Sequence, residues 1–184
     1  MSRVRGDRSK GRAMHHDPII QALADKQAIY ELMVRYAERI DANDPAGAAA
    51  CFAEDGIGMY WGEAAGRKAI AARLAGILDR FHTTSHHLSN VGITLDGDRA
   101  TAMSYVYAFH RMAGTMEAMH VWGRWVDELA RIDGEWLFTR REVVGVGAVN
   151  RGKDANGDTV SDVDQPGHPG RLSRQPAEDL WRAG

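Results

Sequence analysis

The sequence predicts an α+β domain in which three helices come first and an antiparallel sheet follows. Two observations support this class. Apolar residues recur with the helical period as far as Phe81, whereas the chain from Thr84 onward alternates turn signals with runs rich in Val, Ile, Thr and aromatic residues. Because the helices precede the strands instead of alternating with them, we expect the helices to cover one face of a twisted sheet.

The first predicted helix lies between Asp17 and Ala42. Its apolar stripe consists of Ile29, Leu32, Met33, Tyr36 and Ile40. The Asp44-Pro45 pair predicts a second, short helix that runs to about Ala53, because the carboxylate can cap free N–H groups and proline suits the first turn. These two helices supply an apolar face for the core.

A short strand over residues 56–61 and a third helix over residues 67–81 complete the first half of the domain. Turn signals at residues 96–98, 113–114 and 133–134 then separate four predicted strands. Consecutive hairpins of this kind form an antiparallel meander, and the face beneath the helices is the expected pocket.

Composition favours one domain with tails. The 184 residues are 44% hydrophobic, the formal net charge is −2, and Cys51 is the only cysteine. This charge gives no reason to expect nucleic acid or a membrane surface, and the single cysteine fits a cytoplasmic protein. We divide the chain into a disordered basic leader (1–16), one domain (17–149) and a tail or lid (150–184), whose Gly, Pro and Asp content denies it a core.

Four polar residues are candidates for an acid/base site: Asp41, Tyr60, His86 and His110. Each has a structural alternative, as a helix end, a half-buried aromatic or a hydrogen-bonded histidine. Asp41 falls in the last turn of a helix, where the helix dipole opposes its charge, so we expect a partner and a pKa raised towards that of a useful base. The central histidines lack metal-binding spacings, so we expect no metal and no cofactor.

The chain resembles the SnoaL-like branch of the nuclear transport factor two superfamily over roughly Asp17 to Val149. The resemblance rests on RYAERIDANDPAGAAACFAEDG, G-R-K-A-I, TTSHHLSNVGITLDGDRATA and RIDGEWLFTRR. It implies a cone-shaped barrel made from a curved, mixed or antiparallel sheet. Within that branch the pattern is most similar to scytalone dehydratase, dehydrochlorinases and bile acid dehydratases, which share the positions of Asp41 and His86, with Asn90 completing an H-x-x-x-N segment.

The resemblance further implies a cofactor-free lyase. His86 is then the base, Asp41 orients it, Tyr60 polarises a substrate oxygen, and His110 assists the leaving group. The expected walls are Met33, Tyr36, Phe52, Trp61, Val106, Trp122 and Trp125, which suit a hydrophobic cyclic substrate such as a polyketide, terpenoid, steroid or aromatic catabolite. An isomerase or hydrolase using the same pocket and a non-catalytic binding protein are the alternatives.

Three further points stay open at the level of sequence. Strand parity would place His87 beside His110 after a two-residue turn in LDGDR, and His86 there after a three-residue turn; the resemblance favours His86. Apolar residues of both parities between Ser104 and Trp125 predict a homodimer or homotrimer. The apolar pair Leu180-Trp181 favours a lid role for the C-terminal segment.

Overall fold

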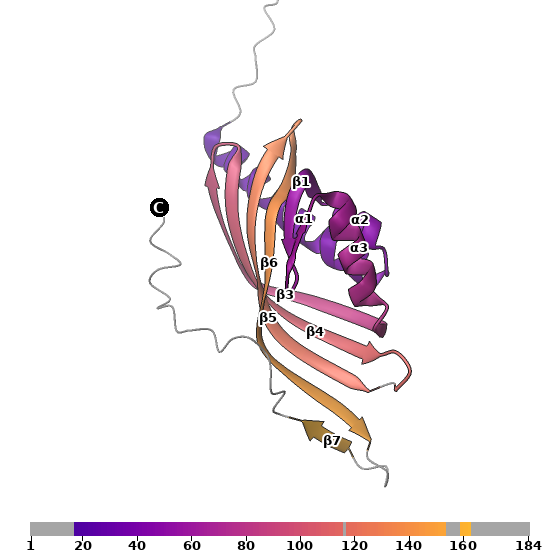
Figure 1. Cartoon of the computed structure of the whole chain (residues 1–184). Coiled ribbons are helices and arrows are strands. Elements are labelled where there is room, and N and C mark those ends of the chain that lie inside the picture. The colour runs from indigo at the N-terminus through magenta and orange to yellow at the C-terminus, as the bar shows by residue number, and fades with distance from the viewer. Residues whose placement is uncertain (1–16, 116, 154–158, 163–184) are drawn as a thin grey trace, which may run out of the picture.

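The computed structural model describes residues 17–115, 117–153 and 159–162. It confirms an α+β architecture with three helices ahead of a curved mixed sheet that does not close on itself (Figure 1). The helices are α1 (Pro18–Asp41), α2 (Pro45–Ala49) and α3 (Arg67–Leu78). The strands are β1 (Phe52–Met59), β2 (Glu63–Ala65), β3 (Phe81–Asp96), β4 (Arg99–Met112), β5 (Ala118–Ile132), β6 (Glu135–Lys153) and β7 (Thr159–Asp162).

The two N-terminal helices each begin at a capping aspartate, of which Asp44 was predicted from the sequence. The Asp17 side chain accepts from the Ile19 N–H at 2.9 Å, and the Asp44 side chain accepts from the Gly47 N–H at 2.8 Å. The expected end of α2 near Ala53 is wrong, because the helix stops at Ala49 and Phe52 already belongs to β1. Burial of the Phe52 side chain against Phe138, with ring centroids 5.4 Å apart, holds that segment extended.

The sheet has the strand order β2-β1-β6-β5-β4-β3, with β7 paired to β6. The four strands β3 to β6 form the predicted antiparallel meander. The short strand β1 adds to this meander in parallel with β6 and turns back into β2. We define the inner face as the one that carries His110 and Trp125, and the outer face as the one that carries Tyr107 and Trp122.

A β-bulge in β3 determines which of the paired histidines reaches the inner face. The β3–β4 turn has two residues, since Asp96 pairs with Arg99, and an unbroken ladder would therefore pair His87 with Ala108 on the inner face. The register instead shifts between Ser89 and Gly92, so that His86 pairs with Ala108. Asn90 lies at this shift with φ 49°, a left-handed conformation that asparagine tolerates better than most residues. The extra residue in β3 thus reverses the facing expected from a two-residue turn, and His86 instead of His87 lies on the inner face.

Substitutions at Asn90 should report on the bulge. We expect Asn90→Val to lower the free energy of unfolding by about 1–2 kcal/mol, because a β-branched residue is strained at positive φ. Asn90→Gly is the matched control and should change it by less than about 0.5 kcal/mol, since glycine adopts this conformation freely. Urea denaturation of both variants measures the difference, and equal losses would show that the side chain rather than the backbone angle matters at this position.

The sheet continues past the domain boundary expected at Val149. β6 runs to Lys153 and pairs with β5 and β7, because strand pairing uses backbone groups and needs no apolar side chains. The expected leader, residues 1–16, lies outside the described residues, and so do residues 163–184, which contain Leu180 and Trp181. Among the described residues, no helix is long and apolar enough to cross a membrane.

A buried ion pair lies in the core. Arg141 and Asp127 are both almost completely buried and form two side-chain hydrogen bonds of 2.7 Å each. The guanidinium also lies 4.3 Å from the ring centroids of Tyr36 and Trp125 and 3.9 Å from that of Phe138. Arg141 therefore supports Tyr36 and Trp125, two aromatic residues that also line a cavity beneath the helices.

Candidate active site

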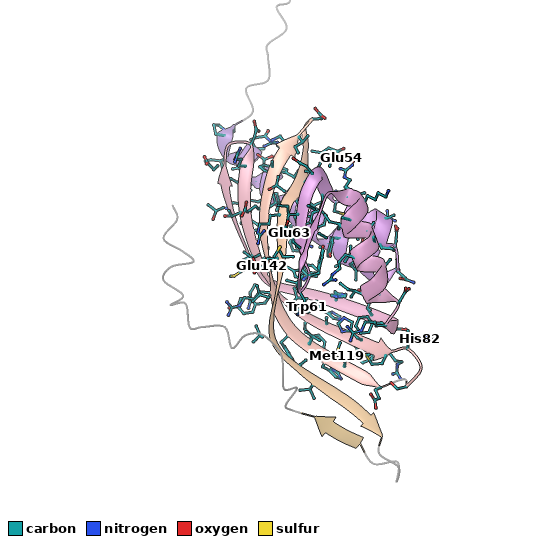
Figure 2. All side chains as sticks on the ribbon, viewed as in Figure 1. Glu54, Trp61, Glu63, His82, Met119 and Glu142 are labelled. Atoms are coloured by element: carbon teal, nitrogen blue, oxygen red, sulfur yellow. The ribbon has the colours of Figure 1, made fainter. Side chains whose placement is uncertain are left out.

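A cavity of about 750 Å³ lies between the inner face of the sheet and the helices. Its walls come from the end of α1, the turn after β1, α3 and the strands β3 to β6. Figure 2 shows Trp61 beside the part of the sheet that carries Met119, and both residues line this cavity. The polar side chains Tyr36, Tyr60, His86 and His110 share it with aliphatic residues such as Ile77, Val121 and Val143. This volume suits a small organic molecule that is mostly apolar.

Asp41 and His86 form the hydrogen-bonded dyad expected from the sequence. The distance from His86 Nδ1 to Asp41 Oδ1 is 2.6 Å, and the backbone N–H of His86 donates to Asp41 Oδ2 at 2.8 Å. Thr84 Oγ1 also donates to Asp41 Oδ1 at 2.8 Å. These contacts place the last residue of α1 against the start of β3, and they orient the His86 ring.

The pKa of Asp41 is lowered, which corrects the expectation that it would be raised. Partial burial raises this pKa, but the hydrogen bonds from the His86 side chain and backbone and from Thr84 outweigh burial by stabilising the carboxylate. Because an ionised carboxylate can only accept, His86 must carry its proton on Nδ1. The Nε2 lone pair is then the one available to the cavity, as a base requires.

His110 lies next to the dyad in an environment that keeps it neutral. Its ring centroid is 5.4 Å from that of His86 and 4.4 Å from that of Phe81. Burial, together with repulsion from His86, lowers the pKa of His110 to about 4. Its Nδ1 is buried and has no hydrogen-bond partner among the described residues. A neutral imidazole that lines the cavity can exchange hydrogen bonds with a ligand, but at pH 7 it is not an imidazolium acid.

This depressed pKa predicts a pH dependence of stability. Between the unfolded value near 6.5 and the folded value of about 4, the unfolded chain binds a proton at His110 that the folded protein does not. Stability contributed by neutral His110 is therefore present above about pH 6.5 and is lost as the pH falls towards 4. We expect the free energy of unfolding to fall less for His110→Leu than for the native protein between pH 7 and pH 5, as measured by urea denaturation. Equal losses in the two proteins would contradict this assignment.

Tyr36 and Tyr60 form a buried pair with 2.8 Å between their hydroxyl oxygens. Burial raises the pKa of Tyr36 to about 12 and that of Tyr60 well above its ordinary value, so both hydroxyls stay protonated. The pair holds two O–H protons, and only one of them is used in the hydrogen bond between the two oxygens. The second is available to an acceptor oxygen in the cavity. Trp125 separates the pair from the histidines, with its ring 5.3 Å from Tyr36 and 5.9 Å from His86.

The remaining predicted pocket residues divide into three groups. Trp61, Val106 and Trp125 line the cavity together with Tyr36. Met33 and Phe52 are fully buried in the core and do not line it. Trp122 is 45% exposed on the outer face, which removes it from the pocket, because the register of β5 places Val121 and Gly123 inward instead.

The pairing of Tyr36 with Tyr60 and the contribution of α3 to the cavity were not predicted from the sequence. Helical spacing could have indicated a pocket role for Tyr36, since this residue lies on the same apolar stripe as Ile40, in the helix that ends at Asp41. His87 lies on the outer face, with its ring 5.8 Å from that of Tyr107. Among the described residues, no group of three or more His, Cys, Asp or Glu side chains is arranged to hold a metal ion.

The chain belongs to the SnoaL-like domain family, whose pattern matches residues 21–142. It is 30% identical to a solved structure described as a candidate scytalone dehydratase from Novosphingobium aromaticivorans, with a TM-score of 0.65 over 79% of this chain and 97% of that one. A protein of unknown function from Mycobacterium tuberculosis is 25% identical, with a TM-score of 0.64 over 70% of this chain and 76% of its own. No curated protein sequence matches the chain.

The same fold also occurs at lower sequence identity. A hexachlorocyclohexane dehydrochlorinase from Novosphingobium barchaimii has a TM-score of 0.65 over 83% of this chain and 99% of its own, at 15% identity. Identity this low supports a shared fold and nothing finer. Solved structures with this fold thus include one described as a candidate scytalone dehydratase and one described as a dehydrochlorinase.

Proposed function

We propose that this protein is a cofactor-free lyase that removes a proton from carbon and expels a leaving group from a hydrophobic cyclic substrate. The observation that carries the proposal is the 2.6 Å hydrogen bond between Asp41 and His86 at the wall of a largely apolar cavity. The candidate scytalone dehydratase at 30% identity supports dehydration as the reaction class.

In the proposed reaction, His86 and Asp41 carry out the proton transfers. His86 Nε2 accepts the proton from a carbon next to a carbonyl group, and the ionised Asp41 stabilises the imidazolium that forms. The C–H electron pair becomes the new double bond as the C–O bond breaks and the leaving oxygen takes that bond's electrons. The imidazolium then returns its proton to this oxygen, releasing water and restoring the neutral ring.

The other polar groups stabilise charge on the substrate's oxygens. The spare O–H of the Tyr36–Tyr60 pair donates to the carbonyl oxygen, on which negative charge develops as the proton leaves. Neutral His110 donates a hydrogen bond to the departing oxygen, since its low pKa excludes a role as a charged acid at neutral pH. Both roles use hydrogen-bond donation without proton loss.

A panel of cyclic β-hydroxyketones tests the proposal. Incubation with native protein is expected to give products that have lost one molecule of water, detected by mass spectrometry, at rates well above those without protein. A rearranged product of unchanged mass in ordinary water would indicate an isomerase that moves the proton without expelling a group. Binding of panel members without turnover would identify a non-catalytic binding protein and overturn the proposal.

We also propose that the protein assembles as a homodimer or homotrimer through the outer face of the sheet. This face exposes Tyr105, Trp122, Val126 and Val146, although apolar residues of this size usually avoid water when gathered on one surface. Sedimentation at micromolar concentration is expected to give a dimer or trimer, and replacing Trp122 with Arg should shift it towards monomer. A native protein that sediments only as a monomer would rule out this assembly.

A further inference from the structure

Trp61 has a backbone conformation that is unusual for a large side chain. Its φ of 52° lies in the left-handed region, which bulky residues rarely adopt because it strains the backbone. It precedes Gly62, whose φ of 146° is accessible mainly to glycine. The turn between β1 and β2 is therefore held in a conformation that its own sequence does not favour at Trp61.

Arg73 of α3 enforces this conformation. Its Nη2 donates to the Tyr60 carbonyl at 2.7 Å and to the Trp61 carbonyl at 3.2 Å, and its Nε donates to the Tyr60 carbonyl at 3.3 Å. The Tyr60 N–H also donates to the Gly62 carbonyl across the turn at 2.9 Å. Strained residues persist where neighbouring groups determine their geometry in this way, and they concentrate at ligand-binding sites.

The two neighbouring aromatic residues of this turn differ in their exposure to solvent. Tyr60 is 3% exposed and hydrogen-bonded to Tyr36, whereas Trp61 is 56% exposed and still lines the cavity. None of the ring contacts in the described part of the chain involves the Trp61 indole. Figure 2 places it where the β1–β2 turn approaches the half of the sheet that carries Met119. An indole held at the rim of an aromatic-walled cavity thus keeps one face available.

We propose that Trp61 is a specificity-determining residue that stacks on a planar, aromatic ring system whose oxygen points to the Tyr36–Tyr60 pair. An indole gains more from stacking on a flat aromatic partner than on a puckered ring, so the cavity should prefer aromatic over saturated rings of the same carbon skeleton. The inference uses the pocket of the proposed function and deepens its substrate class. It does not depend on proton abstraction by His86, because it concerns binding alone.

Two probes with one skeleton separate stacking from general hydrophobic burial: 2-naphthol, which is planar, and decahydro-2-naphthol, which is puckered. Calorimetric titration of native protein is expected to show tighter binding of 2-naphthol. Trp61→Leu should weaken 2-naphthol binding by about tenfold, within the usual range for an aromatic pair, and that of the saturated alcohol by less than about twofold. Trp61→Phe keeps a ring and should restore most of the preference.

Tyr30→Leu is the matched control, because it removes an exposed aromatic side chain of α1 that does not line the cavity. It should leave both affinities unchanged. Equal weakening of both probes by Trp61→Leu, an effect of Tyr30→Leu as large as that of Trp61→Leu, or no 2-naphthol binding by the native protein would each overturn the proposal. If the probes behave as expected and no hydroxyketone is dehydrated, the lyase proposal fails while this one stands.

Discussion

Replacing His86 with alanine is expected to abolish most turnover, lowering kcat/KM by roughly 10²–10⁴ on the best substrate of the hydroxyketone panel. Asp41→Asn should cost nearly as much, because a neutral amide neither stabilises the imidazolium nor enforces the proton on Nδ1. If the two side chains act as one unit, the double variant should lose little more than either single variant. Steady-state kinetics with each variant measure these losses.

Neighbouring substitutions supply the controls for the dyad. His87→Ala removes an outer-face histidine one residue away and should leave kcat/KM within about twofold of native, as expected for a surface change. Thr84→Val removes one of the three hydrogen bonds to Asp41 and should have an intermediate effect. Losses that add in the Asp41/His86 double variant would indicate independent roles and contradict the dyad mechanism.

Arg141→Met is expected to lower the free energy of unfolding by about 3–5 kcal/mol, the largest stability effect that we predict. The substitution leaves the buried Asp127 carboxylate without the two 2.7 Å hydrogen bonds that compensate its burial. Burial already raises the pKa of Asp127, so the unpaired acid should take up a proton at a higher pH than before. Chemical denaturation of the native and variant proteins measures the loss.

A double variant separates lost pairing from lost packing. In Arg141→Met combined with Asp127→Leu, neither buried charge remains, and most of the stability should return, as for other buried pairs replaced by apolar residues. Arg140→Met is the matched surface control, since Arg140 pairs with Glu142 at a part-exposed site, and it should cost less than about 1 kcal/mol. A double variant as unstable as Arg141→Met would show that packing of the guanidinium against the three rings is the larger contribution.

Local sequence determined much of the fold. The stripe from Ile29 to Ile40, the cap Asp44 and the three turns of the meander act over a few residues, so helical period and turn chemistry predict them. The end of α2 and the strand β2 were not predicted from the sequence. Both depend on β1, which pairs in parallel with β6 some 80 residues later; such a contact leaves no periodic signal in either segment.

The candidate site shows the same division. The sequence selected Asp41, Tyr60 and His110 and left His86 and His87 as alternatives for the fourth position, with the resemblance to the SnoaL-like branch favouring His86. Only the tertiary structure decided that His86 and not His87 faces the cavity, since one extra residue at Asn90 reverses the parity of β3. It also placed Trp122 on the outer face and paired Tyr36 with Tyr60. These outcomes depend on register and on contacts between distant strands and helices, which single-residue chemistry does not encode.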